Sequence, residues 1–236
     1  MKRHWTLEDI RWQDFDPSKV DAGVLCAVKA AALVEFNAPD YVTYLCNVFA
    51  DRPDVKEMLV GWGKEEIQHG QALARWAELA DPTFNFEAAF KRFQAGYRIP
   101  LNEMQSVRGS RAGELVARCV VESGTSSYYT AIKDATDEPV LRRMNSVTTS
   151  FSMNSSRRWT RLCPPVCDAP RLHSAACRKP MMMNCLTPIT LPMRQMMAAC
   201  LMSARSLRAL MKRAPSRFIA VSIRIVWWRW SARPSV

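Results

Sequence analysis

The fold is decided by the stretch LVGWGKEEIQHGQALARWAELA, residues 59–80. Its apolar residues recur at steps of three and four, the spacing of one face of an α-helix. Two ionisable residues, Glu66 and His69, occupy that face between tryptophans and leucines. The whole face consists of Leu59, Trp62, Glu66, His69, Leu73, Trp76 and Ala80. The pattern predicts a long helix, begun by the turn around Pro53, whose buried side carries a carboxylate and an imidazole.

Two further segments have the same spacing. Residues 20–49 repeat apolar side chains at steps of four and three, and Glu35 lies in that repeat. Pro39, one turn later, is expected to kink this helix because it leaves a backbone carbonyl without its helical partner. A third helix is predicted from about Arg111, with Glu122 on its apolar face. Each of three helices therefore carries an acid on the side that should be buried.

A fourth helix is predicted to begin at about residue 138. Thr136 supplies a capping side chain there, and Pro139 suits the first turn of a helix. Strand-like alternation is weak, and the connection from residue 81 to 110 is long. We expect an all-α protein, an antiparallel four-helix bundle whose fourth helix and C-terminal region are disrupted.

The acids on the buried faces need a common explanation. An isolated ionised carboxylate in a helical core costs on the order of several kcal/mol unless it is neutralised, paired or bound to a metal. Glu35, Glu66, His69 and Glu122 offer carboxylate and imidazole donors that suit iron or manganese. Two simpler interpretations stay open. In the first, Glu35 pairs with a Lys or Arg at the edge of the face. In the second, Glu122 caps a turn near Gly124.

The spacing of these four residues resembles that of a known family. The chain is similar to the ferritin-like superfamily, in its rubrerythrin-like bacterial branch. The residues that carry this resemblance lie on successive helices: Glu35, then Glu66-Ile67-Gln68-His69, then Glu122. The resemblance covers about residues 20–143. It implies a four-helix bundle with a di-iron or di-manganese centre, and redox or iron-oxidation chemistry with O2 or peroxide. The family pattern also requires a second Glu-x-x-His about thirty residues after Glu122, and the sequence has no glutamate after Glu138. We therefore expect this chemistry to be impaired, so that the chain is an uncertain oxidoreductase or ferroxidase.

Composition divides the chain at residue 144. The first 143 residues contain 18 Lys and Arg and 21 Asp and Glu, whereas residues 144–236 contain 15 Lys and Arg and one acid, Asp168. All 8 glycines precede the division. We expect an N-terminal segment (1–19), an incomplete helical bundle (20–143) and a poorly ordered basic tail (144–236). No secretory signal opens the chain, so we expect a cytoplasmic protein. The longest apolar run of the tail is too short to span a membrane.

The tail has the composition expected of a shifted reading frame. Read from the third base of each codon, Met144-Asn145 must encode Glu, and the following codons permit Glu-Phe-Arg-His, the pair that the family pattern lacks. We hypothesise that residues from about 144 onward are a frameshifted translation of a ferritin-like gene. Sequencing the coding DNA around residue 143 tests this, since an inserted or missing base there should restore Glu-x-x-His, and an unchanged sequence would refute it.

The tail and the bundle each allow another function. Cys163, Cys167, His173 and Cys177 have spacings near those of zinc sites, and the basic, tryptophan-bearing end from residue 217 to 233 could attract phosphate backbones. We nevertheless expect metal ions, O2 or peroxide as partners, with no specific nucleic acid and a possible homo-oligomer. We expect Trp62, Trp76 and Tyr129 to be core residues. The rival class is a metal-free helical-bundle interaction protein.

Overall fold

The computed structural model describes residues 5–146, 159 and 162. These residues are mainly helical and include no β-strand, which confirms the all-α class. Three short 3-10 turns, Leu7–Asp9, Trp12–Asp14 and Pro17–Lys19, precede the α-helices. The labelled helices are α1 (Ala22–Phe36), α2 (Ala38–Val48), α3 (Pro53–Ala80), α4 (Phe86–Gly96) and α5 (Arg111–Ala135). Helical backbone also covers residues 139–146.

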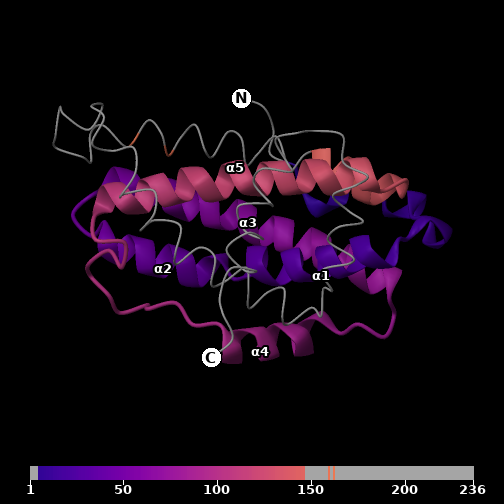
Figure 1. Ribbon diagram of the computed structural model, residues 1–236, viewed down its shortest axis with the longest axis horizontal. Coiled ribbons are helices and arrows are strands. Elements are labelled where there is room, and N and C mark those ends of the chain that lie inside the picture. The colour runs from indigo at the N-terminus through magenta and orange to yellow at the C-terminus, as the bar shows by residue number, and fades with distance from the viewer. Residues whose placement is uncertain (1–4, 147–158, 160–161, 163–236) are drawn as a thin grey trace, which may run out of the picture.

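The helix predicted over residues 20–49 is in fact two helices. Asp21 caps α1, since its Oδ1 accepts hydrogen bonds from Gly23 N at 2.9 Å and Val24 N at 3.0 Å. The chain then breaks at Asn37, and Pro39 lies in the first turn of α2. Because proline has no N–H and suits a helix start, the expected kink is a full break between two helices that lie end to end (Figure 1).

Helix α3 is the central element and has the predicted extent. It begins at Pro53, ends at Ala80 and packs along both α1 and α2. Its apolar face is buried, with Leu59, Leu73 and Trp76 at most 1% exposed. Figure 1 shows α5 running beside α3, and α4 on the far side of α1 and α2. The layers therefore enclose the middle of α3, where Glu66 and His69 lie.

Helix α4 lies within residues 81–110, where the sequence analysis expects a long connection and no helix. Asn85 caps this helix, accepting a hydrogen bond from Ala88 N at 2.7 Å. Phe86 and Phe90 then pack edge-on against Phe36, with ring centroids 5.3 and 5.0 Å away. Aromatic residues spaced three and four apart thus build an amphipathic helix that covers the end of α1.

The fourth helical segment begins where it was predicted. Thr136 Oγ1 accepts a hydrogen bond from Glu138 N at 3.1 Å. The buried carboxylate of Glu138 accepts from Leu141 N at 2.8 Å and from the indole of Trp76 at 2.7 Å. It also accepts from Asp16 N at 3.2 Å. One side chain therefore caps this helix and ties it to α3 and to the N-terminal segment.

The compositional boundary at residue 144 falls inside this helical segment. Met144 and Asn145 are buried in the core, 5% and 0% exposed. Trp159 is also buried and meets the ring of Trp62 edge-on, with centroids 5.8 Å apart. The remainder of the tail lies outside the described residues. The poor order expected for it and the reading-frame hypothesis therefore stay predictions.

One described segment is long and apolar enough to cross a membrane by length and composition alone. It is Ala22–Val48, which spans α1 and α2 and reaches a mean hydropathy of 1.3 over its most apolar 18 residues. Of that 18-residue window, 56% is buried inside the protein. Helices that form the core of a bundle pass the same test, and packing against α3 accounts for the apolar character here.

Candidate metal centre

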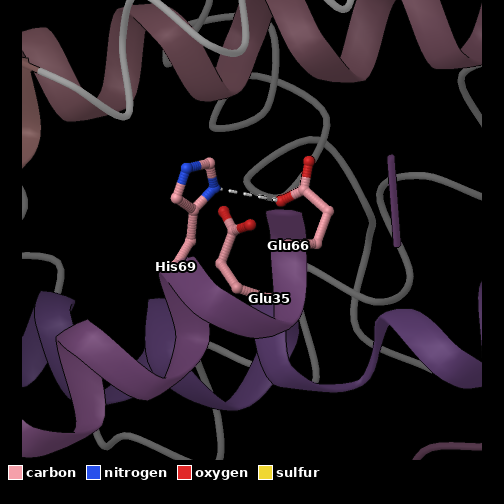
Figure 2. A group of neighbouring side chains, drawn as sticks. All are labelled: Glu35, Glu66 and His69. Atoms are coloured by element: carbon pink, nitrogen blue, oxygen red, sulfur yellow. Dashed lines mark ion pairs between the residues drawn. The ribbon is translucent and has the colours of Figure 1, made fainter. Parts of the chain in front are cut away.

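Glu35, Glu66 and His69 converge in the middle of the bundle. One ligand atom from each lies within 4.8 Å of the other two. Nδ1 of His69 is 3.6 Å from Oε2 of Glu66. Figure 2 shows the three side chains pointing toward one another, Glu35 from α1 and the other two from α3. Three of the four ligands predicted from the sequence therefore meet.

Local helix geometry positions the two groups on α3. Glu66 and His69 are three residues apart, so one turn of helix places both side chains on the same face. Both are buried, at 6% and 1% exposed, and Glu35 is partly buried. Four of the other five residues of the predicted face, Leu59, Trp62, Leu73 and Trp76, are buried around them. The polar groups therefore stand in an otherwise apolar layer.

Two glycines of α3 let α1 and α2 approach closely enough to complete the group. A Cβ on Gly70 would lie 2.6 Å from the backbone nitrogen of Phe36, the residue after Glu35. A Cβ on Gly63 would overlap the side chain of Val42 on α2. Any larger residue would push the helices apart, so glycine at 70 in particular sets how near Glu35 comes to Glu66.

Glu122, the fourth predicted ligand, lies beside this group without belonging to it. It is 3% exposed on α5, and its Oε1 accepts a hydrogen bond from Trp62 Nε1 at 3.0 Å. Its charge raises the pKa of Glu66, so the two carboxylates are close neighbours electrostatically. The structure thus brings all four predicted residues into one buried region, three of them within ligand distance of a common point.

Burial dominates the electrostatics of the region. It raises the pKa of Glu66 to about 8, and the nearby charge of Glu122 adds to the shift. It likewise raises the pKa of Glu122 to about 8, with a contribution from Glu35. Burial, followed by the charge of Glu66, raises the pKa of Glu35 well above its usual range. Burial lowers the pKa of His69. Mutually repelling carboxylates beside a neutral imidazole are what a bound cation would stabilise.

Hydrogen-bond donors surround the carboxylates from outside. Tyr129 Oη donates to Oε1 of Glu35 at 2.5 Å, as Trp62 donates to Glu122. The sequence interpretation took Tyr129 and Trp62 for core residues only. They are buried, and in addition they donate hydrogen bonds to Glu35 and Glu122, a role that their position on the same helix faces could have suggested.

Two other neighbours were missed by the sequence interpretation. The indole of Trp5 stacks on the imidazole of His69, with centroids 5.5 Å apart and planes 11° from parallel. A cavity of about 70 Å³ lies beside this stack, lined mainly by apolar residues and reached by Met144. On the opposite flank, the buried guanidinium of Arg118 lies over the ring of Tyr41, 5.0 Å from its centroid.

The donor set fits a transition-metal ion. Two ligands about 2.1 Å from one ion stand at most about 4.2 Å apart, so the observed separations within 4.8 Å need only a small closure. Carboxylate oxygens with one imidazole suit iron or manganese. The alternative in which Glu35 pairs with a Lys or Arg is not what the structure shows, since among the described residues the carboxylate of Glu35 accepts its hydrogen bond from Tyr129.

The cysteine–histidine spacings and the basic end of the tail, from Cys163 to Arg233, lie outside the described residues. Comparison with known proteins finds no match, whether with a family model, a curated protein or a solved structure.

Proposed function

We propose that the protein binds iron or manganese at Glu35, Glu66 and His69, with Glu122 as a further carboxylate of the centre, and that it is a ferritin-like protein. The observation that carries this proposal is the convergence of two carboxylates and an imidazole within 4.8 Å inside an apolar helical core. Three such groups gathered by chance would leave buried charge without compensation, which folded proteins avoid.

The residues have distinct roles in this proposal. Glu66 and His69 form the ligand pair of α3, and Glu35 closes the site from α1. Tyr129 fixes the orientation of Glu35 by holding one of its oxygens, and Trp62 does the same for Glu122. A bound metal of this kind supplies redox chemistry with O2 or peroxide, or oxidation of ferrous iron. The sequence contains no second Glu-x-x-His, so we expect a single metal ion and little turnover.

A specific observation favours a second candidate, a metal-free helical bundle that binds other proteins. Burial raises the pKa of Glu35 and of Glu66, which favours their neutral forms and lets the cluster exist without a cation. With Tyr129 and Trp62 donating to the neighbouring oxygens, the cluster has its own internal hydrogen bonds. A core of this kind would be a stable, if costly, structural feature.

Simultaneous replacement of Glu66 and His69 by leucine separates the two candidates. If the site binds metal, the wild-type protein should hold about one iron or manganese ion per chain by elemental analysis, and the double variant should hold none. The exposed Glu57→Leu change on the same helix is the matched control and should leave metal content unchanged. A wild-type chain without metal, and a double variant stabilised by about 1–4 kcal/mol, would support the metal-free bundle instead.

A further inference from the structure

The cavity of about 70 Å³ beside the candidate centre lies where three parts of the chain meet. The N-terminal segment forms its outer side, where the indole of Trp5 stacks on the imidazole of His69. The residues of its inner wall come from α3 and from the helical segment 139–146, and they are at most 5% exposed: His69, Ala72, Leu73, Val140 and Met144. The cavity is therefore built into the core and touches the candidate centre at His69.

The walls of this cavity exclude charged occupants. Apart from His69, the described residues of the inner wall are apolar. The two charged residues at the rim have partners of their own, since Asp9 accepts a hydrogen bond from Thr6 N at 2.7 Å and Arg143 pairs with Asp14 at 3.2 Å. An ion would lose its hydration here without gaining a counter-charge. Water is also a poor occupant, because a buried water needs about two to four polar partners.

The volume of the cavity restricts the size of an occupant. A single water needs on the order of 10–15 Å³, and an apolar protein cavity of about 150 Å³ accommodates benzene. The volume of about 70 Å³ lies between these two values. It is too small for an aromatic ring and large enough for a molecule of a few atoms. Such a molecule enters an apolar cavity favourably if it is itself apolar, because its transfer out of water is favourable.

We propose that this cavity binds a small, uncharged apolar gas molecule, and that dioxygen approaches His69 through it, beside the stacked ring of Trp5. The preference for such a gas follows from the walls and the volume alone. The choice of dioxygen within this class rests on the proposed function. Glu35 and Glu66 are not among the described residues that line the cavity, so the gas site and the candidate metal ligands meet only at His69.

Xenon is the probe for the cavity, and methyl NMR of the full-length, metal-free protein is the readout. Xenon under pressure should shift the methyl signals of Val140 and Met144 until they saturate. It should leave the signals of Leu59, which is buried in a separate core cluster, unchanged. Ala72→Leu adds an isopropyl group to the cavity wall and should abolish the shifts. Gln71→Leu, on the exposed side of the same helix, is the matched control and should keep them.

Dioxygen itself is followed through its paramagnetism, because it increases the relaxation rates of the methyl groups that it approaches. Under oxygen pressure these rates should rise more for Val140 and Met144 than for Leu59. Nitrogen at the same pressure is the diamagnetic control. Ala72→Leu should remove the difference between the cavity methyl groups and Leu59.

The outcomes distinguish this inference from the proposed function. Xenon shifts that do not saturate, or that persist in Ala72→Leu, would overturn the gas site, and equal oxygen relaxation at Met144 and Leu59 would overturn the dioxygen route. Neither result alters the metal content by which the proposed function is judged. A chain that binds xenon and no metal would refute the metal centre and support the gas site. If Ala72→Leu does not fold, Ala72→Val should weaken the shifts, and unchanged shifts would overturn the site.

Discussion

The indole of Trp5 covers the imidazole of His69 in a nearly parallel stack, with ring centroids 5.5 Å apart. The side-chain amide of Gln68 donates to the backbone carbonyl of Trp5 at 2.6 Å and holds the Trp5 main chain beside α3. The N-terminal segment is held further along by Asp14, which pairs with Arg143 at 3.2 Å. His69 is therefore shielded from solvent by a segment outside the helical bundle.

Replacing Trp5 by alanine should uncover His69. We expect the imidazole to become reactive toward diethyl pyrocarbonate, measured by mass spectrometry of the peptide that contains it. The variant should lose about 1–2 kcal/mol of stability in urea denaturation, because a partly buried aromatic ring is removed. Trp5→Phe keeps an aromatic cover and serves as the control. Equal reactivity of His69 in the wild type and Trp5→Ala would show that this stack does not protect it.

Tyr129→Phe should weaken metal binding without disturbing the fold. The change removes the donor that holds Oε1 of Glu35 at 2.5 Å, and loss of such an orienting group typically costs about 10–100-fold in metal affinity. Calorimetric titration with Mn²⁺ measures the effect. The neighbouring Tyr128→Phe is a close control, because Tyr128 donates to the backbone carbonyl of Ala27 and not to a candidate ligand. An unchanged dissociation constant in Tyr129→Phe would exclude the orienting role.

The metal-free protein should lose stability as pH rises from 6.5 to about 8. Burial raises the pKa of Glu66 and of Glu122 from 4.5 to about 8. A carboxyl whose pKa is higher in the folded than in the unfolded chain stabilises the fold fully below its unfolded pKa. That contribution is lost as pH rises through the folded value. His69 acts in the opposite direction only below its unfolded value of 6.5, since burial lowers its pKa.

Urea denaturation at pH 6.5, 7.2 and 8 checks this prediction, with Glu66→Gln as the control that should flatten the dependence. Metal affinity should change with the opposite sign over the same interval, because protons must leave the carboxyls before an ion binds. Stability that stays constant from pH 6.5 to 8 in the metal-free wild type would contradict the raised pKa values.

Gly70→Ala and Gly61→Ala should have opposite effects, although both lie in α3. A Cβ at Gly70 would meet the Phe36 backbone at 2.6 Å, whereas a Cβ at Gly61 would meet nothing within 4 Å. We expect Gly70→Ala to destabilise the protein by about 1–3 kcal/mol through overpacking. Gly61→Ala should stabilise it by up to about 1 kcal/mol through higher helix propensity. Two variants of equal stability in urea would show that α1 and α3 do not need this close contact.

Much of the helical framework could be predicted from spacing. The limits of α3, the start of α5 and the cap at Thr136 follow from periodic apolar residues and capping side chains, which are local signals. Helix α4 was missed because its aromatic residues were assigned to a connection, and only their packing on Phe36 reveals an amphipathic helix. The break at Asn37 depends on how strongly Pro39 interrupts the helix, which packing decides.

The candidate ligands could be named because they occur at apolar positions of periodic helices. Their surroundings could not, since Trp5 and Arg118 reach the region from parts of the chain with no sequence relation to Glu66. Spacing along a helix does not show which neighbouring segment covers a side chain. The same reason explains why Trp62 and Tyr129 were recognised as core residues and not as hydrogen-bond donors.

The cap formed by Glu138 has a consequence for protein engineering. Every described partner of that carboxylate, including Trp76 and Asp16, lies before residue 144. The starting point and direction of the last described helix are therefore set by residues before the compositional boundary at 144, and Met144 already reaches the cavity beside His69. The bundle can serve as an acceptor scaffold: a synthetic helix grafted after residue 143 would start beside His69 and could return a second pair of ligands to this core.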